Sequence, residues 1–583
     1  MIWSTFKKLY RLINNKEKYK LFIFFLHIIL SAIFELLSLG LIVPAIGTLI
    51  SPTFLKDFYN ENLILNFLED LTQNQIILMG IIFIVLIYLI KALFLTYSIY
   101  WQSNFGRDFH IYISKKLYSK YLSQTYSFHL NSNSSNLIRN INIEASSIYS
   151  SLMSSMMLFM ELIVIFSITF LLIKIEPLVS TAVIFISILI GVFFSFFSKT
   201  KILVWGQKKV YHQGKSIKAV MEGLAGVKIV KLLGKQKEFY NRFSYHINKF
   251  ADYERLHVIV NQLPRIWLEF SAILFLNLII ISISIEGKSF QLILPTLALF
   301  TGAAFRIIPS LSKILNSIQV LNFNKTSIEI IYNDIFLDNQ KEDITILTKS
   351  NINVKNISCE KIYFSFQEND SLILSNLNFK INKGESLGII GESGSGKSTI
   401  VNILLGLLEP NSGKILVNNK NIFGSKKYLR SWQNSIGYVP QDIFLFDDTI
   451  ANNVIFGFDE KSINKDALDM ALKNAKVDKF IESLPMGINT IVGERGVKLS
   501  GGQVQRIGIA RALYRNPSIL IFDEATSSLD YDTENSIVES INNLAGKTKI
   551  IVAHRLSTIK NCDRVIKINK GVIQMIGKLE DLD

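Results

Sequence analysis

The chain has 583 residues, of which 49% are hydrophobic, and its formal net charge is +15 at pH 7. It is longer than one hydrophobic core usually supports, and its mean hydropathy of +0.32 excludes an ordinary soluble protein. The basic residues concentrate in residues 7–20 and 199–255, which flank apolar stretches. This distribution favours contact with anionic membrane lipid, and we expect no nucleic acid partner.

Six apolar stretches of about 20 residues or more occupy the first 310 residues. Each approaches or exceeds the length that an α-helix needs to cross the hydrocarbon core of a membrane. The first is too long, and too poor in small residues at its end, to be a removable signal peptide. We therefore expect an α-helical transmembrane domain over residues 1–337, with spans at about residues 22–50, 76–100, 152–173, 178–197, 266–285 and 290–310.

The connections between the spans predict their orientation. Those after the second and fourth spans, residues 101–151 and 199–263, are long and basic, whereas the others are short or lean acidic. Positive loops stay in the cytoplasm, so these two connections and both termini should be cytoplasmic. Both are helical in pattern and offer a place where a cytoplasmic domain could dock.

The segments on either side of the bundle have patterns of their own. In the loop at residues 51–75, apolar residues recur at helical spacing, which predicts a short amphipathic helix that caps the bundle or, as a less favoured alternative, contacts substrate. After the last span, residues 322–337 are expected to continue it as a cytoplasmic helix. The polar residues 338–351 read as a linker, and a second domain should occupy residues 352–583.

A glycine-rich run in the second domain follows a strand pattern and opens a helix pattern, which predicts a phosphate-binding loop. Its glycines let backbone N–H groups surround phosphate oxygens at a helix N-terminus. Lys397 should contact the β- and γ-phosphates of ATP, and Ser398 should offer a hydroxyl to Mg²⁺. The nucleotide-binding residues of this run are Gly391, Ser393, Gly394, Ser395, Gly396, Lys397, Ser398 and Thr399.

Two acids follow the apolar strand pattern at residues 519–522. Carboxylates at the end of a parallel strand lie at the edge of the sheet where phosphates bind. Asp523 should hold Mg²⁺ through water, and Glu524 should polarise the water that attacks the γ-phosphate.

About twenty residues before these acids, Leu499 is followed by four residues that open a helix: Ser500, Gly501, Gly502 and Gln503. Together with the phosphate loop, this sequence closely resembles the ATP-binding cassette (ABC) family. The resemblance implies a Q-loop at Gln441, which also contacts Mg²⁺, a D-loop with Asp530, and a switch histidine at His554. It places Phe366 under the adenine ring, where the family more often has tyrosine.

The order of the two halves resembles the exporter branch of this family. The resemblance implies a six-span ABC exporter transmembrane domain fused to an α/β P-loop nucleotide-binding domain, an ATP hydrolase coupled to transport. One copy of each domain implies a half-transporter that forms a homodimer, in which Ser500 and Gly502 complete the site of the other copy. We expect a multi-pass protein of the bacterial inner membrane.

Ionisable residues in the spans are costly and therefore point to the substrate. Counted from the outer ends of their helices, Lys91 and Arg306 lie about 22–24 Å deep and Arg265 deeper, near the inner leaflet. These cations would suit a phosphate or pyrophosphate. Alternatively, Arg265 pairs with Glu269 and Lys91 extends to the interface. The acids Glu35 and Glu161 are candidate counter-charges.

Residues 264–269 and 305–310, with the helix of the external loop, resemble bacterial flippases of lipid-linked oligosaccharides. The resemblance implies flipping of a polyprenyl-pyrophosphate-linked oligosaccharide to the outer side of the membrane, for glycoprotein or surface-glycan synthesis. Lys91 stands where that group favours arginine. The alternatives are an exporter of lipid A, other lipids or drugs, and an ATP-gated channel. The six expected spans exclude the soluble DNA-repair and translation ATPases of the family.

Overall fold

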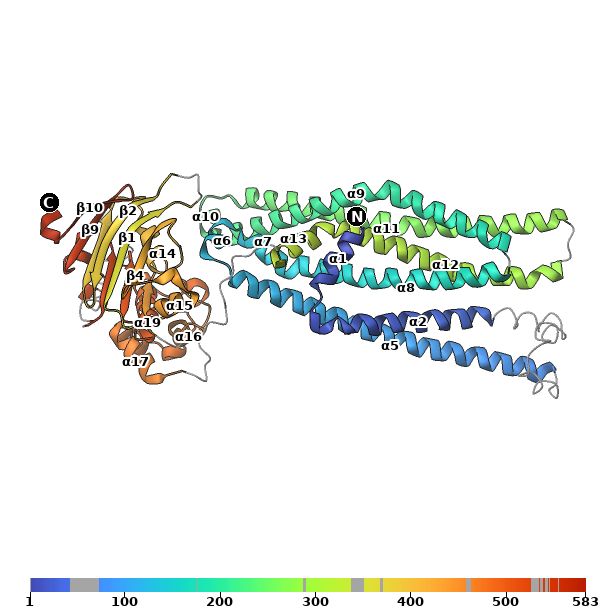
Figure 1. Ribbon diagram of the computed structural model, residues 1–583, viewed down its shortest axis with the longest axis horizontal. Helices are drawn as coiled ribbons and strands as arrows, with labels where there is room; N and C mark the ends of the chain where they lie inside the picture. Colours follow the sequence, from blue (N-terminus) through green and yellow to red (C-terminus); the bar gives the residue numbers. More distant parts are fainter. Residues whose placement is uncertain are drawn as a thin grey trace. The chain divides into compact units, whose positions relative to one another are not determined.

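The chain forms two compact units, made of Met1–Leu122 with Ser132–Gln340 and of Ser123–Asn131 with Lys341–Asp583. Figure 1 shows a helical unit and a unit that contains β-sheets. The external-loop helix expected within residues 51–75 lies almost wholly outside the described residues. The computed structural model describes residues 2–41, 73–175, 177–286, 290–336, 351–366, 371–457, 463–525, 534, 538–539, 544, 546–553 and 555–582.

Long helices that run alongside one another build the helical unit (Figure 1). They are α2 (Tyr19–Gly40), α5 (Gln73–Leu122), α8 (Ala145–Ile175), α9 (Pro177–Ala225), α11 (Gln236–Glu286) and α12 (Phe290–Phe323). In the described part of the chain, four segments are long and apolar enough to cross a membrane, and they include parts of α2, α5, α8 and α9. The fifth and sixth predicted spans fall on α11 and α12.

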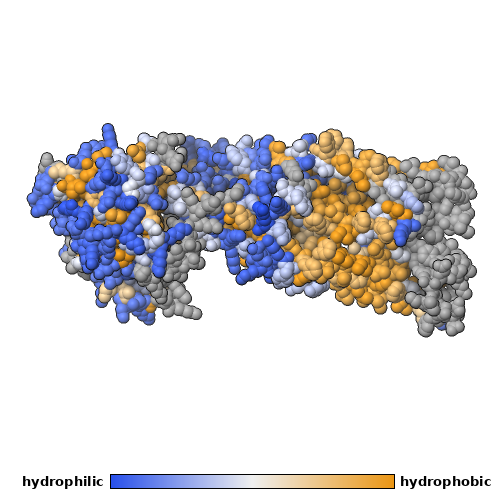
Figure 2. All heavy atoms as spheres, viewed as in Figure 1, coloured by the Kyte–Doolittle hydropathy of each residue, from blue (hydrophilic) through white to orange (hydrophobic). Residues whose placement is uncertain are grey.

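Helix α5 shows how the sequence divides a single helix between two environments. Toward its start, side chains such as Leu78, Phe83 and Leu89 are more than half exposed although they are apolar. Toward its end, apolar residues recur every four positions and are buried on one face: Phe105, Phe109, Ile113 and Leu117. The first pattern fits a surface that faces lipid, and the second fits an amphipathic helix in water. In Figure 2, hydrophobic surface correspondingly gathers on the part of the helical unit remote from α10 (Val227–Leu232).

The predicted cytoplasmic extensions are helical. The first continues α5 to Leu122 and returns through short elements to α8, and the second consists of the ends of α9 and α11 with α10 between them. The elements not yet named are α1 (Ile2–Leu12), α6 (Tyr126–Asn131), α7 (Ser134–Arg139), a π-helical turn (Asn140–Glu144) and α13 (Lys325–Phe336).

The last span continues helically as predicted, with a single turn residue between its two parts. Helix α12 ends at Phe323, and α13 begins at Lys325. Between them, the side-chain amide of Asn324 donates to the carbonyl oxygen of Ser147 at 3.2 Å and to the hydroxyl oxygen of Ser150 at 3.0 Å. These bonds hold Asn324 against α8, while its backbone N–H donates to Val320 at 2.9 Å and its carbonyl oxygen accepts from Ile328 at 3.0 Å.

The second unit contains a four-stranded sheet in the order β2-β1-β4-β5 and a six-stranded sheet in the order β10-β9-β3-β8-β7-β6. In the larger sheet only β10 is antiparallel to its neighbour, and β7 and β8 are buried along their whole length, as expected for parallel strands covered on both faces. The strands are β1 (Asn356–Phe364), β2 (Leu374–Asn382), β3 (Ser386–Gly391), β4 (Ser412–Val417), β5 (Lys420–Asn421), β6 (Ile436–Val439), β7 (Ile519–Asp523), β8 (Thr548–Val552), β9 (Arg564–Asn569) and β10 (Val572–Gly577).

Helices surround these sheets, and α14 (Lys397–Leu404) and α19 (Gly501–Tyr514) begin at the two glycine motifs. The segment Ser123–Asn131 clusters with this unit, although the sequence places it within the predicted first domain. Tyr126 of this segment packs against the apolar cluster around Trp432. The remaining helices are α15 (Lys426–Asn434), α16 (Ile450–Ile455), α17 (Lys465–Asn474), α18 (Asp478–Glu482) and α21 (Leu556–Ile559).

Candidate functional site

The phosphate loop lies where the sequence predicts it, between β3 and α14. Gly391 ends the strand, and a Cβ on it would come within 2.2 Å of the carbonyl oxygen of Ile568 on β9. Gly396 has φ +101°, a conformation that favours glycine, and a Cβ there would meet Leu374 at 2.6 Å. The other expected loop residues, Ser393, Gly394, Ser398 and Thr399, lie in the same turn and the first turn of α14. The close packing explains why glycine is required at both ends of the turn.

Two polar groups inside the loop suit a phosphate ligand. The Lys397 ammonium donates to the carbonyl oxygens of Gly391 and Glu392 at 2.8 and 2.9 Å, so it lies within the turn. Burial lowers the pKa of Lys397, while Glu524 and Asp523 oppose this shift. The hydroxyl of Ser395 is buried and has no hydrogen-bond partner among the residues that the structure describes. An unpaired buried hydroxyl beside a lysine is a ready donor for a phosphate oxygen.

The register of the parallel sheet brings four chain segments to one edge. Ile389 and Asp523 both pair with Val552 at the end of β8, and Val439 pairs with Phe522. The phosphate loop after β3, the acids after β7, the segment after β8 and the Q-loop after β6 therefore start at the same edge. This arrangement assembles the residues that the sequence motifs predicted separately.

The acid pair lies against the Q-loop. The Gln441 side-chain amide donates to a Glu524 carboxylate oxygen at 2.6 Å, and Tyr438 donates to Asp523 at 3.4 Å. Burial, and next the charge of Glu524, raise the pKa of Asp523. Glu524 has φ +49°, in the left-handed region that a non-glycine residue rarely adopts, and its backbone N–H donates to the carbonyl oxygen of Val552 at 3.0 Å. Strained backbone of this kind concentrates at functional sites.

These side chains fit a magnesium ion by their chemistry. Ser398, Gln441 and Asp523 offer a hydroxyl, a carboxamide and a carboxylate oxygen, which are the hard ligands that Mg²⁺ prefers. Because the Gln441 amide nitrogen donates to Glu524, the amide oxygen is the atom of that side chain that can serve a cation.

The signature motif begins α19 as a capping box. The Ser500 hydroxyl accepts from the backbone N–H of Gln503 at 3.3 Å, and the Gln503 side chain accepts from the backbone N–H of Ser500 at 2.8 Å. Ser500 and Gly501 are exposed, Gly502 is partly so, and a Cβ on Gly501 would meet nothing within 4 Å. This helix N-terminus is therefore open to a ligand from outside the subunit.

Helix α19 is held in place further along. The guanidinium of Arg511 donates to the carbonyl oxygens of Asn453 and Phe444 at 2.8 Å each and stacks on the Phe456 ring at 4.5 Å. Burial lowers the pKa of Arg511 to about 10. These bonds fix α19 against the segment that follows the Q-loop.

The remaining predicted nucleotide contacts are only partly described. The Phe366 ring is 49% exposed and stands edge-on to Phe364, so one face is accessible to adenine. Asp530 and His554 lie outside the described residues. Arg555, which follows His554, pairs with Glu534 downstream of the D-loop, and Thr558 donates to the same carboxylate at 2.9 Å. Glu534 thus connects the two segments that contain the predicted D-loop and switch histidine.

A network of ion pairs lies within the helical unit. The buried carboxylate of Glu35 on α2 accepts from Lys91 of α5 at 2.9 Å and from Arg306 of α12 at 2.6 Å. The buried carboxylate of Glu161 on α8 pairs with Arg306 at 3.7 Å and with Lys313 at 2.8 Å. The two expected counter-charges thus contact two of the three predicted substrate cations.

Hydroxyl groups complete this network. Ser310 donates to Glu161 at 2.6 Å, and Lys91 donates to the hydroxyl of Ser38 at 2.9 Å. The sequence reasoning missed Lys313, although its spacing of seven positions from Arg306 places both on one face of a helix. That spacing was the signal that could have identified it.

Arg265 lies apart from this network in the described contacts. It pairs with Glu269 one turn later at 2.7 Å, and its side chain is 68% exposed. The alternative that the sequence left open, a local ion pair, is therefore observed, and a contact of Arg265 with substrate stays a prediction.

Comparison with known proteins agrees with both units. The family model described as the ABC transporter matches residues 374–527, and that of the ABC transporter transmembrane region matches residues 22–301. A solved bacterial Atm1-family ABC exporter with ATP bound superimposes with a TM-score of 0.78 at 24% identity, over 98% of this chain and 96% of its own, which supports the predicted fold.

Curated relatives include two ATP-dependent lipid A-core flippases. That of Cupriavidus pinatubonensis is 33% identical over 62% of this chain and 61% of its own length, and that of Wigglesworthia glossinidia brevipalpis is 33% identical over 67% of both. The chain thus spans about three fifths of the length of the first of these relatives. With a match to the ABC transporter transmembrane region and a match to the ABC transporter ATP-binding domain, the chain belongs to the ABC transporter family.

Proposed function

We propose that the chain is an ATP-driven exporter that moves a phosphorylated glycolipid of the lipid A-core class to the outer side of the bacterial inner membrane. The observation that supports it most is the ion network in the helical unit. Lys91, Arg306 and Lys313 bring three positive charges to two carboxylates, Glu35 and Glu161, so 3 − 2 leaves one positive charge in this set of contacts. An unbalanced cation among apolar helices favours an anionic substrate group.

The accessible cations are those best placed for a substrate. The carboxylates of Glu35 and Glu161 have side-chain exposures of 4% and 0%, whereas Arg306 and Lys313 are 26% and 42% exposed. The buried acids therefore position two cations whose outer surfaces can still bind an anion. Arginine offers paired N–H donors to a phosphate, and lysine adds a point charge.

A second candidate is the polyprenyl-pyrophosphate-linked oligosaccharide that the sequence reading favoured. The same two cations favour it, because a pyrophosphate also presents negative charge to Arg306 and Lys313. The names of the relatives support the lipid A-core class more strongly than this one, so we place the oligosaccharide second. Both candidates join phosphate, glycan and lipid in one molecule.

The proposed hydrolytic step uses the edge of the parallel sheet. Glu524 polarises the attacking water, with Gln441 holding its carboxylate and His554 contacting the γ-phosphate. Lys397 exchanges its bonds with the loop carbonyls for bonds to phosphate oxygens, and Phe366 stacks on adenine. Mg²⁺ held by Ser398, Gln441 and Asp523 would neutralise phosphate charge. Loop N–H groups from residues 391–399 orient the phosphates.

The open N-terminus of α19 supports a homodimer. Ser500 and Gly502 are accessible, and a second copy would present them, with Gln503, to the ATP bound by the first. Asp530 would lie at the same junction. Each dimer would then contain two composite ATP sites.

Reconstitution tests this proposal directly. Purified protein in proteoliposomes would receive labelled lipid A-core in one set and a labelled polyprenyl-pyrophosphate oligosaccharide in another, with ATP-dependent loss from one leaflet as the measurement. We expect lipid A-core to be moved, and Arg306→Gln with Lys313→Gln to reduce the rate about tenfold or more. Arg255→Gln is the matched control, because Arg255 is an exposed arginine of α11 outside this network.

The outcomes separate the two candidates. Movement of the polyprenyl-linked substrate alone would replace the first candidate with the second. Full transport by the double variant would contradict a phosphate contact at these cations, and failure to move either lipid would reject both candidates.

A further inference from the structure

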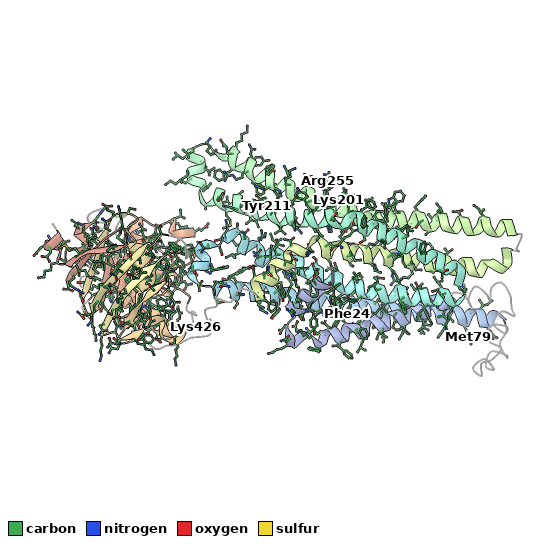
Figure 3. The ribbon with its side chains drawn as sticks, turned by 45° about the horizontal axis from the view of Figure 1, so that its top comes forward. Phe24, Met79, Lys201, Tyr211, Arg255 and Lys426 are labelled. Carbon is green, nitrogen blue, oxygen red and sulfur yellow. The ribbon has the colours of Figure 1, made fainter. Side chains whose placement is uncertain are left out.

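An open cavity of about 530 Å³ lies in the cytoplasmic extensions, apart from the ion network. Helix α8 and the π-helical turn before it, α9, α11 and the junction residue Asn324 form its walls. Helices α9 and α11 lie side by side here, and Tyr211 of α9 and Arg255 of α11 mark this stretch in Figure 3. The volume falls in the range of about 300–1,000 Å³ that is typical of small-ligand sites.

The walls of the cavity are fixed by close packing. Helices α9 and α12 approach so closely at one end that a Cβ on Gly206 would come within 2.0 Å of the carbonyl oxygen of Phe323. His257 stacks on the Phe323 ring at 3.8 Å, and Asn324 is bonded to Ser147 and Ser150. The cavity is therefore part of the packed structure of these helices.

The lining combines several neutral polar groups with one ring. Within the described part of the chain, the side-chain oxygen of Gln213 is buried and has no hydrogen-bond partner, so it is an acceptor that a ligand could satisfy. Ser146 contributes an exposed hydroxyl, and Phe250 contributes a partly exposed ring. Lys209 and Glu254 pair at 2.9 Å, so their charges cancel. A lining with donors, acceptors and no net charge suits hydroxyl groups better than a phosphate or an acyl chain.

We propose that this cavity binds the carbohydrate part of the transported lipid before it crosses the membrane. The inference rests on the proposed function and names a second subsite for it. Along α12, Lys313 and Asn324 are eleven residues apart, or about 16 Å of helix. A phosphate at the ion network would leave sugars on its cytoplasmic side within that distance of the cavity. Hydroxyl groups would bond to Gln213, Lys209 and Glu254, and a sugar face would pack on Phe250.

The first test measures binding of a soluble probe. Core oligosaccharide released from lipopolysaccharide by mild acid would be titrated into the full-length protein in nanodiscs, with saturation-transfer NMR as readout. Gln213→Leu removes the unpaired acceptor at similar size, and Ser146→Phe fills the cavity; each should weaken binding about tenfold. Gln207→Leu is the control, because Gln207 is an exposed glutamine of the same helix outside the lining. Equal binding by the wild-type protein and both cavity variants would overturn the inference.

The second test separates this inference from the proposed function. Flipping of lipid A-core would be compared with flipping of the same lipid without its core sugars, and both variants should lower the ratio of the two rates about tenfold. An unchanged ratio would overturn the sugar subsite while transport itself stands. The wild-type protein could move neither lipid and still bind the oligosaccharide. If Gln213→Leu then weakens that binding, the cavity inference stands and the proposed function fails.

Discussion

The ATP-binding unit and the helical unit both gather charged residues, but by different means. In the former, Lys397, Asp523 and Gln441 follow strands whose carboxyl ends share one edge of a parallel sheet. In the latter, Glu35 meets Arg306 across 271 positions of sequence through the packing of separate helices. A sheet edge is built from hydrogen-bonded backbone, so local motifs predict it, whereas contacts between helices depend on which faces meet.

The two clusters also differ in what their charges do. At the sheet edge the acids and the lysine lie where we propose that the phosphates of ATP bind, and Glu524 adopts a strained backbone conformation. Among the helices, each buried acid pairs with two cations and holds them in position. We therefore expect loss of an acid to stop chemistry in one unit and to destabilise structure in the other.

Glu524→Gln gives the largest expected effect. Removing the carboxylate that we propose polarises water should lower ATP hydrolysis about 10²- to 10⁴-fold while nucleotide binding is retained. Phosphate release and ATP binding would be measured on the same preparation. Glu409→Gln, at an exposed acid of the same unit, should hydrolyse ATP normally. A rapidly hydrolysing Glu524→Gln protein would refute the role of this carboxylate.

Glu35→Ala comes next and tests the helical unit. The change leaves Lys91 and Arg306 without a shared carboxylate, which should cost about 3–5 kcal/mol of stability. Thermal unfolding in detergent would measure the loss. Glu269→Ala removes the partner of the exposed Arg265 and should cost far less, because exposed pairs contribute little. Similar losses in both variants would remove the distinction between the two kinds of pair.

A pH titration tests the electrostatics of the sheet edge. Burial and Glu524 raise the pKa of Asp523 above its usual 3.8, so the folded unit retains this proton at pH values where the unfolded chain has lost it. The folding stability that comes from this proton is therefore lost as the pH rises through the pKa of Asp523 in the folded unit. Acidification protonates the carboxylate and should weaken Mg-ATP binding at a pH above 3.8. Mg-ATP affinity measured against pH would show this loss of binding on acidification, and Asp523→Asn should lack this pH dependence. If the Asp523→Asn protein kept the same pH dependence, the titrating group would be another residue.

Phe366→Ala has the smallest expected effect. Loss of the exposed ring should raise the KM for ATP about two- to tenfold, because aromatic stacking contributes about 0.5–1.5 kcal/mol. Phe366→Tyr keeps the ring and should behave as the wild-type protein does. Steady-state ATPase kinetics would check both, and an unchanged KM in Phe366→Ala would place adenine elsewhere.

Much of the ATP-binding unit was predictable because its motifs are contiguous. Glycines at residues 391–396 and acids after a buried strand have few structural solutions, and the observed β3, α14 and β7 match the predicted elements. The helical unit was predicted as spans, and Glu35 and Glu161 as counter-charges, yet the helices that pack together were not predicted. Apolar composition indicates that a helix crosses the membrane but leaves open which neighbour it packs against.

Particular residues mark that limit. Lys313 was not among the predicted cations, although it pairs with Glu161, and no pattern indicated that Asn324 bonds to α8. The cavity between α8, α9 and α11 has no sequence motif, because its lining comes from residues scattered over four segments. Such features arise only when distant helices pack together.

By itself, the sequence determined the apolar spans, the phosphate loop and the signature motif, since local residue order fixes hydrophobic length and backbone turns. Only the tertiary structure decided that Glu35 and Glu161 share Lys91, Arg306 and Lys313. The reason is physical: a buried charge requires a partner, and the partner is whichever side chain the packed helices bring within a few ångströms.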